Sequence, residues 1–85
     1  MPRSEQELLR QVAAGDRSAF QDLYELHGRD LFAYLSSLET DEKFAADLFQ
    51  DCWLRVAKSL TAGTQVQNFR SWLFAIAINL SLIHI

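Results

Sequence analysis

Three polar side chains in the segment AADLFQDCWLRVAKSL, residues 45–60, recur at the spacing of one helix face. Asp47, Gln50 and Asp51 are three or four positions apart, so in a helix they would share one line, which Leu54 extends. Carboxylate and amide oxygens accept hydrogen bonds from arginine and lysine, and a neighbouring leucine adds apolar contact. Such a line can bind a basic partner helix, or it can be the solvated face of an amphipathic helix.

The other reactive residue types do not form a recognisable catalytic or metal centre in the sequence. Asp47 and Asp51 lie one helical turn apart on an apparently open face, and no nucleophile with a base and no phosphate-binding glycine loop is recognisable. His27 and His84 are far apart, with no cysteine or carboxylate at metal-ligand spacing. We therefore expect no enzyme activity, no metal and no cofactor.

The cysteine usage and the chain ends indicate a cytoplasmic protein. Cys52 is the single cysteine, and its place among Leu48, Phe49 and Val56 predicts a small buried hydrophobe. The start, MPRSEQE, is too polar for a secretory signal, and the charge-free run SWLFAIAINLSLIHI is shorter than the roughly 18 to 20 residues that span a bilayer.

The composition predicts one small packed helical domain over residues 1–85. Apolar residues make up 49% and charged residues 22%, with three glycines and one proline, which suits a folded rather than a disordered chain. The net charge is −3, and residues 1–43 carry the acidity, with five lysines and arginines against nine aspartates and glutamates. The sequence contains no basic patch of the kind that would indicate a nucleic-acid partner.

Hydrophobic periodicity and capping residues predict four helices. Ser4 and Asp16 can cap the first two, Thr40 or Asp41 the third, and Asn68 the fourth. The expected helices span residues 5–14, 16–37, 41–60 and 69–82, with a loop at 61–68. Alternating bulky residues near the end leave a short strand as the minority alternative there.

An ordered series of motifs along the chain resembles region 2 of the bacterial RNA polymerase sigma factors, the extracytoplasmic-function group in particular. The series comprises Gly15-Asp16, Ala19-Phe20 and Leu23-Tyr24, then AxDLxQD at residues 45–51, Leu54, and FRSWLxxIAxN at residues 69–79. The resemblance implies an all-α fold, a small four-helix bundle of the sigma region 2 type. It covers region 2 alone, so we expect no helix-turn-helix region 4 within residues 1–85.

The resemblance assigns a partner to the polar line of the third helix. In that family the line binds the coiled-coil clamp helices of the largest subunit of RNA polymerase. Asp47, Gln50, Asp51 and Leu54 carry over as the polymerase-binding residues.

A second family role, the opening of promoter DNA at the minus-ten element, falls on the loop and the fourth helix. By position the DNA-binding residues are Thr64, Gln65, Gln67, Asn68, Arg70 and Asn79. The chain departs from the family pattern, with Ala75 and Ile78 where related chains usually place basic residues. We therefore expect promoter DNA to bind weakly to this fragment alone.

The apolar fourth helix leaves a second interpretation open, a helical interaction or dimerisation module without a DNA role. Residues 69–82 could associate with a second copy or, as the resemblance implies, be buried against an anti-sigma factor. Trp72 is expected to anchor this helix in the core, whereas Trp53 could lie at the core edge or contact the polymerase.

Overall fold

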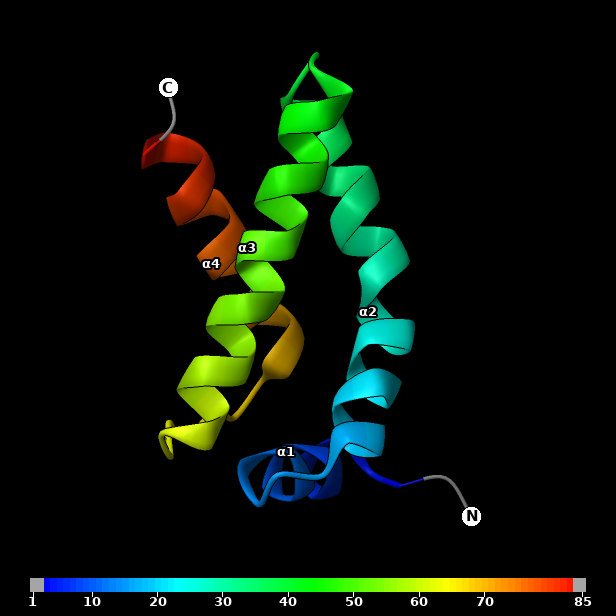
Figure 1. Cartoon of the computed structure of the whole chain (residues 1–85), viewed down its shortest axis with the longest axis vertical. Coiled ribbons are helices and arrows are strands. Elements are labelled where there is room, and N and C mark those ends of the chain that lie inside the picture. Colours follow the sequence, from blue (N-terminus) through cyan, green and yellow to red (C-terminus); the bar gives the residue numbers. More distant parts are fainter. Residues whose placement is uncertain (1–2, 84–85) are drawn as a thin grey trace.

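The computed structural model describes residues 3–83 and contains four helices joined by short connections (Figure 1). They are α1 (Glu5–Ala13), α2 (Arg17–Leu38), α3 (Glu42–Thr61) and α4 (Phe69–Ile83). The predicted all-α, four-helix fold is confirmed, and the minority strand is wrong for the described residues because the last segment continues as helix to Ile83.

Side-chain caps set the start of each helix. The Ser4 hydroxyl accepts a hydrogen bond from the backbone of Glu7 at 3.1 Å, and the Asn68 side chain accepts one from Ser71 at 3.0 Å. Asp41, rather than Thr40, caps α3. Asp16 and Asp41 lie just outside their helices because a capping residue keeps an extended backbone, so α2 and α3 begin one residue later than predicted.

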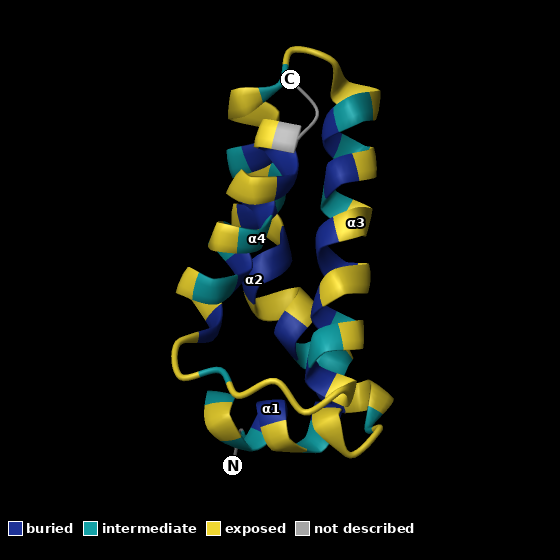
Figure 2. Cartoon of the chain, turned by 90° about the vertical axis from the view of Figure 1, so that its left-hand side faces the viewer, coloured by how far each residue is buried: buried dark blue, intermediate teal, exposed yellow. Residues whose placement is uncertain are grey.

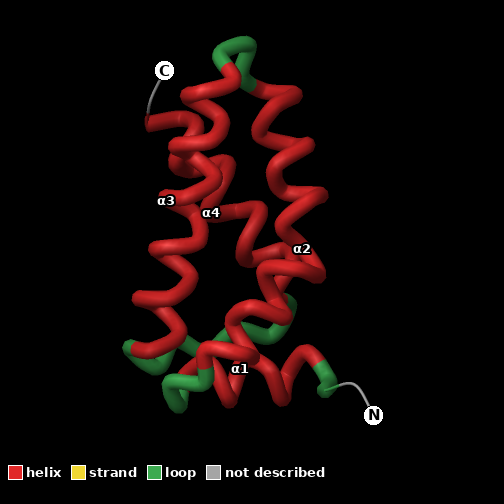
Figure 3. The backbone as a smooth tube through the Cα atoms, turned by 45° about the vertical axis from the view of Figure 1, so that its right-hand side comes forward, coloured by secondary structure: helices red, strands yellow, loops and turns green. Residues whose placement is uncertain are grey.

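The two long helices α2 and α3 run antiparallel, and the other two pack against them. Figure 1 shows α1 crossing the end of the pair where the N-terminus lies, and Figure 3 shows α4 beside α3 in its other half. In Figure 2 the loop between α3 and α4 passes over α1. Gly63 begins that loop with a φ of +93°, a left-handed conformation that glycine adopts without strain.

One hydrophobic core joins all four helices, and in Figure 2 the buried residues face inward from each of them. Its fully buried centre includes Leu23 and Leu31 of α2, Val56 of α3 and Phe69 of α4. Cys52 is also fully buried, as predicted, and burial raises the pKa of its thiol to about 11. The core therefore fixes which face of α3 is turned outward.

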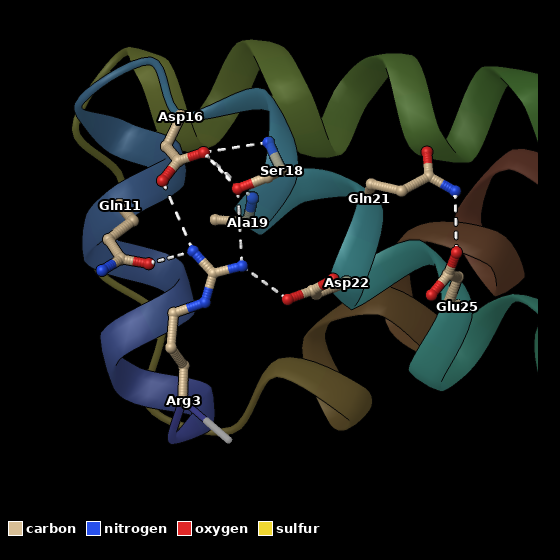
Figure 4. Close-up of polar contacts among 8 residues, drawn as sticks. All are labelled: Arg3, Gln11, Asp16, Ser18, Ala19, Gln21, Asp22 and Glu25. Carbon is tan, nitrogen blue, oxygen red and sulfur yellow. Dashed lines mark hydrogen bonds and ion pairs between the residues drawn. The ribbon is translucent and has the colours of Figure 1, made fainter. Parts of the chain in front are cut away.

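Arg3 ties the start of the chain to the second helix (Figure 4). Its guanidinium donates to Gln11 at 2.6 Å and forms ion pairs with Asp16 and Asp22. Hydrogen bonds from the Ser18 hydroxyl and the Ala19 backbone lower the pKa of Asp16, with a smaller contribution from Arg3. The cluster holds α1 against the first turns of α2.

His27 is a buried structural residue on α2. Its Nε2 lies 2.9 Å from a carboxylate oxygen of Glu5, and its ring packs beside Phe69. Within the described part of the chain, no three His, Cys, Asp or Glu side chains gather closely enough to hold a metal ion. His84 lies outside the described residues. Among residues 3–83, no helix combines the length and apolar character that crossing a membrane requires.

Candidate functional site

The polar line predicted on the third helix lies on the outer surface of α3. Asp47, Gln50 and Asp51 are all exposed, and Leu54 beside them is 57% exposed. Among residues 3–83, none of the three polar side chains has a hydrogen-bond or ion-pair partner. We call these four residues the acceptor stripe. Its oxygen atoms are available to donors from outside the chain.

An apolar hollow of about 490 Å³ adjoins the acceptor stripe, between α2 and α3. Phe20 and Tyr24 of α2 and Phe49 and Trp53 of α3 form its aromatic walls, and Gln50 and Leu54 of the stripe form its rim. The Phe20 and Trp53 rings pack edge to face, with their centroids 5.8 Å apart. We call this hollow the aromatic groove. It sets an apolar surface directly beside the exposed acceptors.

Trp53 belongs to both the core and the groove. The Trp53 side chain is 5% exposed. On the core side its ring packs against Phe69, and another part of the same ring forms a wall of the aromatic groove. Its Nε1 is buried and has no hydrogen-bond partner among the described residues. Trp53 therefore lies at the edge of the core, one of the two alternatives that the sequence left open, and its contact with the polymerase stays a prediction.

The loop residues predicted to bind DNA are exposed and partly held by α1. The Gln6 side chain donates to the backbone carbonyl of Gln67 at 2.8 Å and reaches that of Val66 at 3.5 Å. Thr64 and Gln65 line a small hollow against α1. The Asn68 side chain is engaged as the cap of α4, as its position predicts. The loop thus presents its polar groups on a supported backbone.

The two predicted DNA-binding residues of α4 lie on different sides of that helix. Arg70 faces α2, where its guanidinium pairs with Asp30 at 3.0 Å and lies 4.8 Å from the centre of the Phe74 ring. Asn79 lines a hollow between α3 and α4. The structure therefore does not bring the predicted DNA-binding residues into one cluster.

Trp72 shares the hollow with Asn79 and is half-buried. Its ring packs against Phe69, with the centroids 6.0 Å apart, so the predicted role as a core anchor describes its inner side. The remaining surface of the ring faces the hollow.

Sequence reasoning did not select Phe20 and Tyr24 as site residues. Their spacing of four positions on α2 matches that of Phe49 and Trp53 on α3, and two such aromatic pairs can face one another in an antiparallel helix pair. That repetition is the sequence signal that could have indicated the groove.

Comparison with known proteins shows the family of this chain. Residues 23–85 match the family model described as sigma-70 region 2. The chain is 33% identical over 78 residues to the RNA polymerase sigma factor NccH of Alcaligenes xylosoxydans xylosoxydans, an alignment that covers 92% of this chain and 42% of that protein. The chain thus spans about two fifths of the length of this curated relative, and no solved structure matches it. As its motifs predict, the chain belongs to the sigma-70 region 2 family.

Proposed function

We propose that this chain is the core-binding and promoter-opening domain of an RNA polymerase sigma factor of the extracytoplasmic-function group. The observation that supports the proposal most directly is the acceptor stripe. Three hydrogen-bond acceptors are exposed on one helix face without partners among residues 3–83, in a chain of this family. The role is one of binding rather than catalysis, and its place is the cytoplasm, where the polymerase works.

The stripe and the groove together suit a basic amphipathic helix pair, the form of the polymerase clamp helices. Lysine and arginine side chains of such helices can donate to Asp47, Gln50 and Asp51, and an apolar side chain can enter the aromatic groove beside Leu54. Charged hydrogen bonds of this kind contribute about 1.5 to 3 kcal/mol each. Aromatic side chains around an apolar anchor are typical of the contacts that contribute most of the binding free energy at protein interfaces.

Promoter contact is the second part of the proposal. The exposed loop groups of Thr64, Gln65 and Gln67 can hydrogen-bond bases of an opened minus-ten strand, with Asn79 further along α4. Asn68 acts through its cap of α4, and Arg70 must leave Asp30 or share it to reach a phosphate. The affinity for promoter DNA of this chain alone is therefore low.

Binding to clamp-helix peptides tests the polymerase contact. We expect Asp47→Ala combined with Gln50→Ala to weaken binding by about 1 to 3 kcal/mol for each essential partner that is lost, because the donors of the peptide lose their acceptors. Isothermal titration with a peptide of the two clamp helices measures the change.

The matched control is Gln21→Ala combined with Glu25→Ala. These residues also form an exposed pair of one amide and one carboxylate, but they lie on α2 and hydrogen-bond each other (Figure 4). The control should bind like the parent. Equal affinity of the stripe variant and the parent would show that the polymerase contacts another surface.

Self-association or an anti-sigma partner on α4 is the second candidate function. Its support is the exposure of Ile78 and Leu82, one turn apart on the outer face of α4 and 42% and 63% exposed. Two apolar side chains make a small patch, well below the area of a stable dimer interface. Sedimentation over a concentration series separates the cases, since a monomer at every concentration removes the self-association role.

A further inference from the structure

We propose that Gln6 of α1 is a positioning residue for base selection, because it sets the conformation of the loop between α3 and α4. This inference rests on the proposed promoter role of the loop and adds a residue that the family resemblance did not assign. The Gln6 side chain donates to the backbone carbonyl of Gln67 at 2.8 Å and reaches that of Val66 at 3.5 Å. In this role Gln6 acts through the loop backbone and is not itself a DNA contact.

The two ends of the loop are held by the helices that they join. The backbone amides of Gly63 and Thr64 donate to carbonyls in the last turn of α3, and the Asn68 side chain caps α4. Among residues 3–83, the hydrogen bonds from Gln6 are the only ones that reach the segment between these ends, residues 65–67. The middle of the loop therefore depends on α1 for its polar contacts.

Packing restrains the middle of the loop at one residue. Val66 is half-buried and packs against the core, whereas Gln65 and Gln67 on either side of it are exposed. A hollow of about 110 Å³ lies between residues 63–66 and α1, so this part of the loop is not closely packed on the helix. Backbone with few buried apolar contacts moves readily unless hydrogen bonds restrain it. The bonds from Gln6 therefore determine how the two exposed glutamines are presented.

The donor stands on a turn of α1 that is itself fixed to the helices around it. Glu5, the residue before Gln6, has a carboxylate oxygen 2.9 Å from Nε2 of His27 on α2. The His27 ring packs beside Phe69, the first residue of α4, and Leu9 of α1 is buried in the core. The first turn of α1 is thus joined to the start of the helix that the loop enters. Gln6 consequently places the loop relative to α4.

The direction of the glutamine side chains matters for base selection. Hydrogen bonds weaken steeply when donor and acceptor are misaligned, and an amide group can both donate and accept. On a rotating backbone, Gln65 or Gln67 could turn to suit any base, whereas on a fixed backbone it suits only some of them. Loss of the bonds from Gln6 should therefore reduce the discrimination between bases more than the total affinity for a strand.

Backbone order parameters from NMR relaxation, measured without DNA, test whether Gln6 holds the loop. The variant is Gln6→Met, since methionine has nearly the shape of glutamine and no N–H donor. We expect the order parameters of residues 65–67 to fall from the range of rigid backbone, about 0.85, to the flexible range, below about 0.6. Unchanged order parameters in this variant would overturn the proposal.

The matched control is Gln21→Met, the same exchange at an exposed position of α2 whose side chain bonds Glu25 rather than the loop. Residues 65–67 of the control should keep the order parameters of the parent. An equal fall in both variants would show that the loop responds to any such exchange, and would likewise refute the role of Gln6.

Fluorescence anisotropy at low salt with single-stranded homopolymers of deoxyadenosine, deoxycytidine and thymidine tests the effect on base selection. We expect Gln6→Met to reduce the ratio of the highest to the lowest affinity at least about twofold, as the loss of one net hydrogen bond implies, while Gln21→Met keeps the parent's ratio. A mobile loop with an unchanged ratio would overturn the positioning role.

Equal binding of the three homopolymers by the parent would overturn both the promoter role of the loop and the inference that rests on it. The order parameters then show which step fails. A fall in Gln6→Met places the failure in the contact between loop and bases, and no fall places it in the hold of Gln6 on the loop.

Discussion

Asp47→Arg combined with Asp51→Arg is expected to abolish measurable binding of the chain to clamp-helix peptides. Two charge-assisted hydrogen bonds are lost, at about 1.5 to 3 kcal/mol each, and two positive charges then face the basic partner. A loss of about 4 kcal/mol or more corresponds to about a thousandfold in affinity. Both side chains are exposed and have no partner among residues 3–83, so the fold itself should be unaffected.

The control for this experiment carries the same change in net charge at another place. Glu25→Arg combined with Glu42→Arg alters exposed residues of α2 and of the first turn of α3, away from the acceptor stripe. The control should keep most of the parent affinity, with a small loss at low salt from the changed net charge. If both double variants lose affinity equally, the attraction depends on overall charge and the stripe is not the contact.

Phe69→Ala is expected to cost about 3 to 5 kcal/mol of unfolding free energy, because it removes a large ring from a fully buried position. Phe69 is the first residue of α4, and its ring packs beside His27 of α2, Trp53 of α3 and Trp72. The cavity would therefore open where three helices meet. Small domains have a typical stability of about 5 to 15 kcal/mol, so a domain at the lower end of this range would retain little margin.

Urea denaturation followed by circular dichroism measures this loss. Leu82→Ala serves as the control, since it shortens an apolar side chain on the same helix that is 63% exposed. The control should change the unfolding free energy by less than about 0.5 kcal/mol. A similar midpoint for the two variants would mean that α4 is not anchored through its first residue.

The features that sequence reasoning predicted are those set by neighbours within one helix. The periodicity of apolar residues fixed the four helices, and the short polar residues Ser4, Asp16 and Asn68 marked their starts because a cap acts on the next two or three backbone amides. The exposure of Asp47, Gln50 and Asp51 followed likewise, since Leu48, Cys52 and Val56 define the opposite, buried face of α3.

The features that it did not predict depend on residues far apart in the chain. The aromatic groove needs Tyr24 and Phe49 to meet across two helices. The pairing of Arg70 with Asp30 spans 40 positions, and periodicity contains no information on which side of α4 faces α2. These relations arise from helix packing, which single-helix patterns leave open.

The Gln6 side chain of α1 supports the backbone of the loop between α3 and α4, and a change at this position could alter the stiffness of the loop. The family match begins at residue 23, so Gln6 lies outside the matched part, whereas the loop carbonyls that accept its hydrogen bonds lie inside it. A hydrogen bond contributes only about 0.5 to 1.5 kcal/mol net to stability, so the contact between Gln6 and the loop can be broken at small cost. Exchange of one side chain in α1 can thus stiffen or loosen the loop proposed to contact bases, while every residue proposed to bind DNA or polymerase stays the same.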